Sequence, residues 1–531
     1  MNSEENNQED MKNSIIQAYK TIVEMKKELP SYREFLIRDI KRDTIRRNFG
    51  GIEFLHEYMR EHENDFLSSH FSSVDNIFSD LRSVSNSEKQ IFVITTAVAD
   101  SVAHKGFLDA LGTYCDERDA QLVIMPCEST TNSFENKTAV FDPVFNDPKY
   151  LFVQDDTRLN DNISLCSIQV SAKQIKPITG LQRLGNREGS YVFASPKQFL
   201  EYIPAGNSRI NNFTIMTPGA CTTPQYFTET FVSKRLSYIA KNDHTIGAVI
   251  VELRDDKRFD FRQIQASDDG SFIDMGVLYT SEGTTENVES NIVFGDLHGI
   301  HIAEDALSYF INKFAGLNVK DIFLHDIFDG YSISHHVKDI AEKADRSGKM
   351  KGNLKDELKD TFNLVYGIHE NLNPVTVNIV KSNHDEFLDR YLSEGRYISD
   401  PENHLTSLKI ATALFEDTDI LRRGFEIAES EIPNNWNFLQ RSDSVKIGDV
   451  ECAAHGDLGL NGAKASLNAL EKIYGTCVTG HNHSAAIQRG VFRVGTLSKL
   501  DMRYNRGPSS WTHTCCLVYE NGQRQLINYV P

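Results

Sequence analysis

The sequence contains the stretch Asn291-Ile292-Val293-Phe294-Gly295-Asp296-Leu297-His298-Gly299, in which an apolar run ends at an aspartate and a histidine. A short apolar run of this kind, closed by glycine, predicts a buried strand. Four further stretches follow predicted strands in the same way: His325-Asp326-Ile327-Phe328-Asp329, Ser382-Asn383-His384-Asp385, His455-Gly456-Asp457 and Gly480-His481-Asn482-His483. Because the carboxyl ends of strands in an open α/β sheet lie together, we expect these polar residues to form one site.

The five stretches share aspartates, histidines and an asparagine, and they contain no cysteine. Carboxylate oxygens combined with imidazole nitrogens suit Mn²⁺, Fe or Zn²⁺, whereas structural zinc sites mostly use thiolates. Two such cations held close together activate water and stabilise the charge on a phosphate ester. The stretches therefore predict a metal-dependent phosphoesterase, which is a hydrolase.

The length of 531 residues predicts two or three domains, and the order of apolar runs predicts an α/β fold. Residues 1–85 show helical spacing of apolar residues. Residues 90–285 open with a strand, a helix and a second strand, which predicts a mixed α/β domain, but its role is not visible in its residues. Residues 287–531 carry the five stretches. Between them, the charged segment 337–370 is expected to form a solvated helix pair.

The amino-acid composition limits the classes of protein to which this chain can belong. Hydrophobic residues make up 40% and charged residues 25%, as in a soluble globular protein. No apolar run is long enough to predict a membrane span, and the polar, acidic N-terminus does not resemble a secretory signal. The eight cysteines are scattered, so we expect reduced thiols and a cytoplasmic protein. The net charge of −19 favours a small substrate over a nucleic acid, without excluding local basic patches.

Basic residues near the N-terminus predict a nucleic-acid contact. Residues 32–51 match the outline of a helix-turn-helix, whose second helix would present Arg42, Arg46 and Arg47 to DNA. The outline resembles the small helix-turn-helix repeats attached to homing endonucleases and other phage nucleases. A solvated basic helix explains the same residues equally well. Arg503, which follows the last of the five stretches, is a further candidate for contact with a nucleic-acid backbone, with a surface turn as the alternative.

In residues 287–531 the order of the five stretches resembles the calcineurin-like metallophosphoesterases. The resemblance implies a β-sandwich flanked by helices, and two divalent metal ions, for which Mn²⁺ is expected and Fe or Zn²⁺ are alternatives. It assigns one metal to Asp296, His298 and His483, and the other to Asn383, His455 and His481. It also implies that Asp326 bridges the two ions.

The resemblance implies a catalytic role for His384, as a general acid for the leaving oxygen or as a phosphate contact. A hydrogen bond that merely supports a ligand is the alternative. Asp329 or Asp385 could orient His384 from behind, and His325, a further residue expected next to the ligands, lies near enough to touch a metal or the substrate.

The sequence departs from the family pattern at three places. His325 and Ser382 replace glycines. Gly330 stands where phosphoprotein phosphatases carry an arginine that grips the phosphomonoester, which disfavours that branch of the family.

These patterns predict a Mn²⁺-dependent DNase similar to the nuclease branch of the Mre11/SbcD type. The domain order also looks like that of the pre-early DNA-degradation and DNA-transfer proteins of T5-like bacteriophages, which implies degradation of host DNA in the bacterial cytoplasm. We expect DNA as the partner, no membrane, and a homo-oligomer. Two alternatives stay open: a small-molecule phosphodiesterase or nucleotide phosphatase, and a non-catalytic DNA-binding scaffold.

Overall fold

A computed structural model describes residues 2–26, 30, 35, 38, 40–49, 52–63, 66, 90–128, 140–204, 212–226, 231–334, 353–416, 418–429, 431–502 and 508–530. The chain divides into two compact units. The first comprises residues 1–88 with 157–159, and the second comprises 89–156 and 160–531. Each unit has a hydrophobic core of its own.

The first unit contains three described helices: α1 (Asn2–Lys26), α3 (Arg42–Phe49) and α4 (Ile52–His62). Their apolar faces form one core, in which Tyr19 also hydrogen-bonds to His56 over 2.8 Å. The helical character expected for this region is confirmed over these residues. Helix α3 lies where the second helix of the predicted helix-turn-helix was expected, whereas most of the first helix lies outside the described residues.

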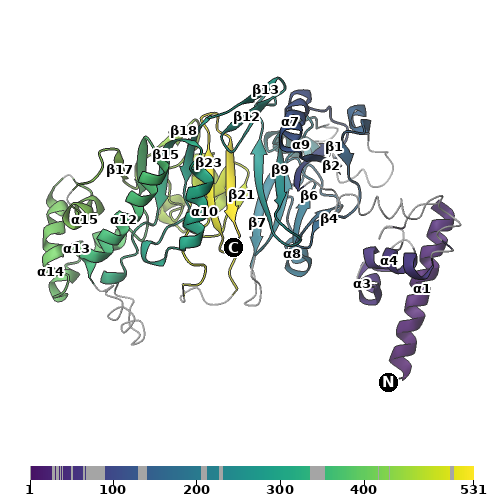
Figure 1. The fold of residues 1–531 in the computed structure, drawn as a ribbon, viewed down its shortest axis with the longest axis horizontal. Helices are drawn as coiled ribbons and strands as arrows, with labels where there is room; N and C mark the ends of the chain where they lie inside the picture. The colour runs from purple at the N-terminus through teal and green to yellow at the C-terminus, as the bar shows by residue number, and fades with distance from the viewer. Residues whose placement is uncertain are drawn as a thin grey trace. The chain divides into compact units, whose positions relative to one another are not determined.

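The second unit begins with the expected strand-helix-strand, formed by β1 (Ile91–Val98), α7 (Lys105–Arg118) and β2 (Gln121–Cys127). Strands β1 and β2 pair in parallel within a five-stranded sheet of order β10-β9-β1-β2-β3 (Figure 1). The other elements here are β3 (Leu151–Phe152), α8 (Gln182–Glu188), α9 (Phe231–Asn242), β9 (Gly247–Leu253), β10 (Phe259–Gln265) and the small sheet β11 (Phe272–Asp274), β12 (Val277–Thr280) and β13 (Gly283–Thr285).

A ten-stranded sheet has the order β18-β19-β20-β22-β21-β7-β8-β6-β5-β4. Its strands are β4 (Thr157–Asn160), β5 (Ile163–Cys166), β6 (Ser190–Phe193), β7 (Gln198–Ile203), β8 (Phe213–Pro218), β18 (Lys446–Ile447), β19 (Val450–Glu451), β20 (Cys477–Thr479), β21 (Ala486–Gln488) and β22 (Val491–Arg493). Strands β7 and β21 pair antiparallel, with Leu200 opposite Ile487. The regions before and after residue 286 therefore share one sheet.

A six-stranded sheet carries the first three of the five motif stretches and has the order β17-β16-β15-β14-β23-β24. Its strands are β14 (Glu289–Val293), β15 (Asn318–His325), β16 (Thr376–Val380), β17 (Trp436–Leu439), β23 (His513–Val518) and β24 (Arg524–Tyr529). Strands β14 to β17 run parallel, so their carboxyl ends meet at one edge. The mixed α/β class expected from the sequence is confirmed.

Helices cover this sheet: α10 (Glu304–Phe314), α12 (Leu354–Leu372), α13 (Glu386–Ser393), α14 (His404–Ile410) and α15 (Ile420–Ala428), while α16 (Leu467–Tyr474) packs on β20 and β22. Figure 1 shows α12 to α15 gathered at one end of this unit. The largest core of the protein combines apolar residues of α10, α12 and α15 with those of β14, β15 and β16.

Helix α12 corrects one expectation for the described part of the segment 337–370, which was predicted to be a solvated helix pair; residues 337–352 lie outside the described residues. Leu358, Phe362 and Val365 are buried on one face of the helix and belong to the main core. The carboxylate of Glu357 is also buried and accepts hydrogen bonds from the backbone N–H groups of Tyr331 and Ser332, at 2.8 and 2.7 Å. Charged residues lie between these positions in the sequence, so the apolar stripe at helical spacing was not recognised from the sequence.

A buried ion pair joins β10 to β11. Arg262 donates to both carboxylate oxygens of Asp274, at 2.5 and 2.6 Å, and its side chain is only 5% exposed. Gln525 in β24 donates to the same carboxylate over 2.9 Å, and Glu252 in β9 lies 2.8 Å from the guanidinium. The pair therefore connects two sheets through groups that water does not reach.

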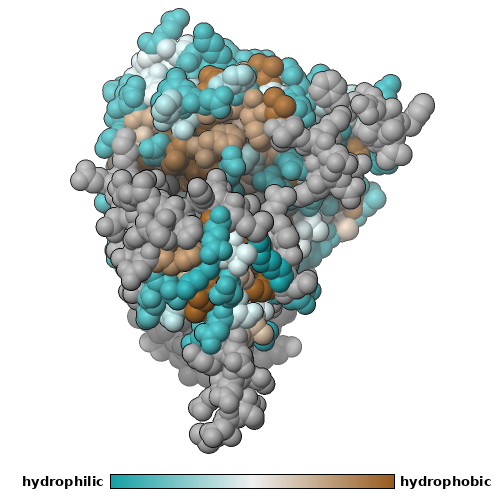
Figure 2. Space-filling view, turned by 90° about the vertical axis from the view of Figure 1, so that its right-hand side faces the viewer, coloured by the Kyte–Doolittle hydropathy of each residue, from teal (hydrophilic) through white to brown (hydrophobic). Residues whose placement is uncertain are grey.

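The surface and the cysteines agree with a globular protein. Figure 2 shows a face on which hydrophilic residues lie beside smaller hydrophobic areas. All eight cysteines are free thiols, and seven of them are buried. Among the residues that the structure describes, no helix is both long and apolar enough to cross a bilayer.

Candidate metal centre

The ends of five strands bring the predicted ligands together. The Asp296 stretch follows β14, Asp326 follows β15 and Asn383 follows β16, all in the six-stranded sheet. From the ten-stranded sheet, β19 leads to His455, and β20 leads to the loop of His481 and His483. The two sheets meet here through isolated bridges such as that between Asp296 and Thr496.

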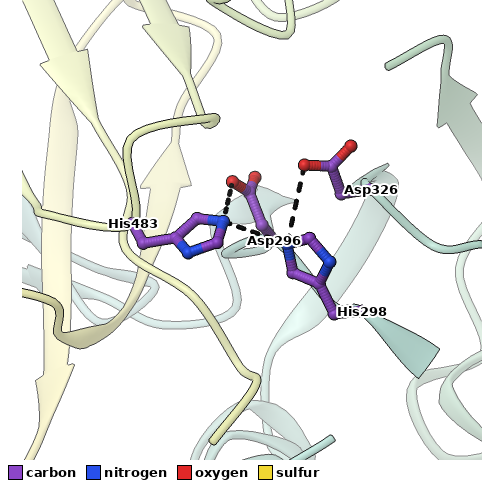
Figure 3. Close-up of side chains that lie close together, drawn as sticks. All are labelled: Asp296, His298, Asp326 and His483. Atoms are coloured by element: carbon purple, nitrogen blue, oxygen red, sulfur yellow. Dashed lines mark hydrogen bonds and ion pairs between the residues drawn. The ribbon is translucent and has the colours of Figure 1, made fainter. Parts of the chain in front are cut away.

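Asp296, His298, Asp326 and His483 form the first group of ligands. All four are buried, and each offers an atom within 4.8 Å of the others. In Figure 3 their side chains point toward one another. The Nε2 atoms of His298 and His483 lie 2.9 Å apart, and His483 Nε2 lies 3.2 Å from Asp296 Oδ2. Imidazole nitrogens that converge with carboxylate oxygens are a donor set for a divalent cation.

Asn383, His455 and His481 form the second group. The Oδ1 atom of Asn383 lies 3.0 Å from His455 Nε2 and 3.0 Å from His481 Nδ1. The Oδ2 atom of Asp326 lies 3.3 Å from His455 Nε2 and 3.6 Å from His298 Nε2. The carboxylate of Asp326 is therefore shared between the two groups, as the predicted bridging role requires.

The environment of Asp296 fits a bound cation. The side chain is fully buried, and its Oδ1 atom accepts no hydrogen bond from any described residue. A Cβ atom at Gly480 would lie 2.2 Å from this oxygen, so only glycine leaves room for it. Because burying a carboxylate oxygen without a partner is costly, a cation at this position would offset that cost.

The backbone is strained at four of the predicted ligands. His298, Asp326, His481 and His483 have φ angles of 48°, 46°, 73° and 56°. The left-handed region costs roughly 1–3 kcal/mol for a residue other than glycine, and such residues concentrate at functional sites. The fold therefore includes unfavourable backbone conformations, at a cost in stability, that direct these side chains toward one point.

Asp329 contacts the predicted ligand His298 more closely than His384, the histidine that it was expected to orient. His298 Nδ1 lies 2.7 Å from Asp329 Oδ1, and the backbone N–H of Ile300 donates to Oδ2 over 3.2 Å. A carboxylate at Nδ1 favours the tautomer whose proton is on Nδ1, which leaves the Nε2 lone pair free to bind a metal. His384 Nδ1 lies farther from Asp329 Oδ1, at 3.9 Å.

Asp385 holds loops together. It accepts hydrogen bonds from the hydroxyl of Ser382 over 2.7 Å and from the backbone N–H of Phe328 over 3.2 Å. Burial, together with the charge of Asp326, raises the pKa of Asp385 to about 6. Ser382 does not belong to the described left-handed positions, so this turn does not require glycine there. The serine instead holds Asp385, which ties the loop after β16 to the loop after β15.

His325 is the last residue of β15 and is fully buried. Its ring centroid lies 5.6 Å from that of His455, and neither ring nitrogen has a hydrogen-bond partner among the described residues. Burial lowers the pKa of His325 to about 4, which keeps the ring neutral. The structure places it behind His455 as a packing neighbour.

His384 lies beside both ligand groups. Its ring centroid is 4.7 Å from that of His298, and its backbone N–H donates to Asp326 Oδ1 over 3.4 Å. The side chain is 25% exposed, and burial lowers its pKa. A histidine that adjoins the ligands and still reaches solvent has the position that a general acid needs.

Protein A1 from Escherichia phage T5 is 30% identical to this chain over 471 residues, which cover 82% of the chain and 81% of that protein. The chain belongs to the Protein A1 family. This relationship bears out the predicted similarity to T5-like bacteriophage proteins and supports a bacteriophage origin. No protein-family model and no solved structure matches the chain. The metallophosphoesterase resemblance of this Protein A1 relative therefore rests on its five motif stretches and stays a prediction.

The structure describes only some of the residues that were predicted to contact a nucleic acid. Arg42 begins α3, and Arg46 and Arg47 are exposed in its last turn. Arg503 lies outside the described residues. Contact of these residues with DNA stays a prediction.

Two residues near the centre were not singled out by the sequence. Trp511 packs against His483 with ring centroids 4.2 Å apart. Arg493 donates from Nε to the backbone oxygen of Ser484 over 2.8 Å. The sequence shows Arg493 only as part of a short strand, and no motif marks Trp511, because both reach the centre through tertiary packing.

Metal binding by this Protein A1 relative is expected to strengthen as pH rises toward about 9. Burial lowers the pKa of His298 and His455, but the surrounding aspartates outweigh burial and raise both pKa values to about 9 in the metal-free protein. Each histidine must lose its proton to bind a metal, so protons compete with Mn²⁺ below that pH. Calorimetric titration with Mn²⁺ at several pH values, in buffers of different ionisation enthalpy, should show proton release. An affinity that is independent of pH would contradict this expectation.

Proposed function

We propose that the protein is a two-metal phosphodiesterase that hydrolyses DNA, with Mn²⁺ as the expected metal. The observation that carries the proposal is the position of the Asp326 carboxylate, which lies within 3.3 Å of His455 in one ligand group and 3.6 Å of His298 in the other. Two divalent cations held there would supply positive charge to the phosphate and make a water molecule easier to deprotonate.

The residues of the chain divide the remaining work. Asp329 holds His298 through Nδ1 and keeps Nε2 directed at the centre. His384 would donate a proton to the leaving oxygen or contact the phosphate. The buried imidazoles and the Asn383 amide bring no negative charge of their own, so the centre would retain its attraction for phosphate.

The loop after Asp329 favours a diester over a phosphoprotein substrate. Gly330 has a φ of 64°, and a Cβ atom there would lie 3.0 Å from the Cβ of Phe387. An arginine at this position would be strained and crowded. The phosphate-gripping arginine of the phosphoprotein phosphatases therefore has no place in this loop.

Purified protein with Mn²⁺, incubated with plasmid DNA and separately with bis-p-nitrophenyl phosphate, tests the proposal. Cleavage of both substrates supports a DNase. Cleavage of the ester alone would favour the small-molecule phosphodiesterase, for which the net charge of −19 is better suited. Absence of both reactions in a metal-loaded protein would favour a non-catalytic scaffold. Degradation of host DNA in the bacterial cytoplasm, DNA binding through α3 and a homo-oligomer belong to the same proposal.

His384→Ala is expected to lower kcat on DNA by about 10²- to 10⁴-fold, the usual contribution of a general acid. The loss on bis-p-nitrophenyl phosphate should be smaller, because p-nitrophenolate leaves without needing a proton. Steady-state kinetics on both substrates measures the difference, and the exposed His62→Ala serves as the control. Equal losses on the two substrates would assign His384 to phosphate binding instead.

A further inference from the structure

A pocket adjoins the loop that carries His481 and His483. Its volume is about 410 Å³, and it lies where β7 pairs with β21. Its polar lining comprises Lys176, Glu201, Tyr202, Asn482, Ser484, Gln488, Arg493 and Ser510. Asn482 and Ser484 flank the predicted metal ligand His483 in the chain, so the pocket and the metal centre share one loop. A volume of this size is in the range of pockets that hold one small ligand.

Two cations, Lys176 and Arg493, line this pocket. The Nε of Arg493 donates to the backbone oxygen of Ser484, and burial lowers the pKa of Arg493 to about 10. Lys176 pairs with Glu201 over 3.3 Å, whereas no described carboxylate lies within ion-pair distance of the Arg493 guanidinium. The Arg493 side chain is half-buried, so its guanidinium has lost part of its hydration and gained no ion pair in return. A phosphate or another oxyanion would supply the missing partner, with the paired hydrogen bonds that arginine forms best.

The aromatic side chain of Trp511 lies outside the pocket lining but directly follows Ser510, which belongs to it. Trp511 contacts His483, and the hydroxyl of its neighbour Ser510 lies 2.7 Å from that of Ser484 in the pocket lining. Nucleobases stack on indole rings with little regard to base identity, which contributes about 1–3 kcal/mol per base. An arginine for phosphate and an indole for a base therefore occur together beside the metal centre.

We propose that this pocket binds the nucleoside monophosphate unit next to the phosphodiester that is cut, with Arg493 on its phosphate and Trp511 on its base. The proposal rests on the proposed function and specifies its substrate class. A pocket of this size admits one nucleotide and no duplex, so the strand that enters it is single-stranded or locally unpaired. The nucleotide unit can come from a polynucleotide or from a free nucleotide, and affinity distinguishes these sources.

The test compares the full-length, Mn²⁺-loaded wild type with Arg493→Met by calorimetric titration with thymidine 5′-monophosphate, which contains no phosphodiester to cleave. Loss of a charged hydrogen bond to phosphate should weaken binding about ten- to hundred-fold. Arg493→Lys should restore part of the affinity. Arg489→Met is the matched control, because Arg489 lies in the same hairpin, pairs with Glu471 and does not line the pocket. Wild-type affinity in Arg493→Met would overturn the proposal.

Fluorescence tests the contact of the base with Trp511. The chain has two tryptophans, and Trp436 is buried in the main core, so Trp436→Phe leaves Trp511 as the only reporter. Binding of thymidine 5′-monophosphate should change the fluorescence emission of Trp511. Inorganic phosphate should bind more weakly than thymidine 5′-monophosphate. Equal affinity for thymidine 5′-monophosphate and inorganic phosphate would show that the site binds only the anion. That result would reject the role of Trp511 in binding the base.

Further titrations identify the source of the nucleotide and separate the two proposals. Tighter binding of a phosphorothioate oligothymidylate than of the mononucleotide supports a polynucleotide strand, whereas equal affinity supports a free nucleotide. If the wild type cleaves DNA but binds thymidylate without Arg493, the pocket proposal fails and the nuclease proposal stands. If thymidylate binds through Arg493 while no diester is cleaved, the nuclease proposal fails and the pocket retains only its role in binding a nucleotide.

Discussion

Asp326→Asn is expected to reduce metal-dependent phosphodiester hydrolysis by about 10³-fold or more, because a shared metal ligand contributes several kcal/mol of charge stabilisation. The carboxylate lies between the two ligand groups, 3.3 Å from His455 Nε2 and 3.6 Å from His298 Nε2. Burial opposes its ionisation, but the neighbouring histidines hold the pKa of Asp326 well below its usual range. Asparagine keeps the shape and removes the negative charge that would hold two cations together.

Two measurements check this result. Initial rates on bis-p-nitrophenyl phosphate and on DNA should fall together, and the metal content after gel filtration should fall with them. Thermal unfolding without metal shows whether the variant still folds. Asp360→Asn is the matched control, since Asp360 is an exposed carboxylate on α12. Wild-type activity and metal content in Asp326→Asn would refute the shared-ligand role.

Asp274→Ala is expected to lower the free energy of unfolding by about 3–5 kcal/mol, the usual cost of breaking a buried ion pair from one side. Arg262 would keep its charge at a side-chain exposure of 5% and would lose two hydrogen bonds to the carboxylate. Gln525 would lose its acceptor as well, which loosens the connection between β11 and β24. Glu252 lies 2.8 Å from Arg262 and offsets part of the loss.

Urea denaturation of the metal-free protein measures this change as a lower midpoint. The control removes one partner of an exposed pair: Glu289→Ala breaks the ion pair with Lys320, whose atoms lie 2.7 Å apart at exposures of 45% and 40%. Exposed pairs contribute about 0–1 kcal/mol, so the control should remain near the wild type. Equal destabilisation by the two substitutions would show that burial of the Arg262 pair has no energetic consequence.

Local patterns were sufficient for the elements that carry the candidate centre. The apolar runs before Asp296, Asp326 and Asn383 are β14, β15 and β16, and these strands are parallel. Strand identity depends on residues within one short segment, and parallel strands place their ends at one edge. The order of aspartates and histidines therefore predicted where these residues gather, and the identity of the metal stays a prediction.

Segments with mixed signals were predicted less well. Helix α12 was expected to be solvated because charges dominate its sequence, yet Leu358 and Phe362 are buried in the main core. Whether an apolar stripe is buried depends on the elements that pack against it. Here these are the strands of the six-stranded sheet and the helices that cover it. The buried carboxylate of Glu357, bonded to two backbone N–H groups, has the same origin.

The sequence by itself determined the α/β class, the strands of the centre and the chemistry of its ligands, because each depends on neighbouring residues in the chain. Only the tertiary structure decided that β7 and β21 share a sheet, with Leu200 opposite Ile487. That pairing forms the pocket, whereas the local hairpin of β21 and β22 places Arg493 beside Ser484. Strand pairing across nearly three hundred residues depends on packing of the whole unit, which leaves no signal in either segment alone.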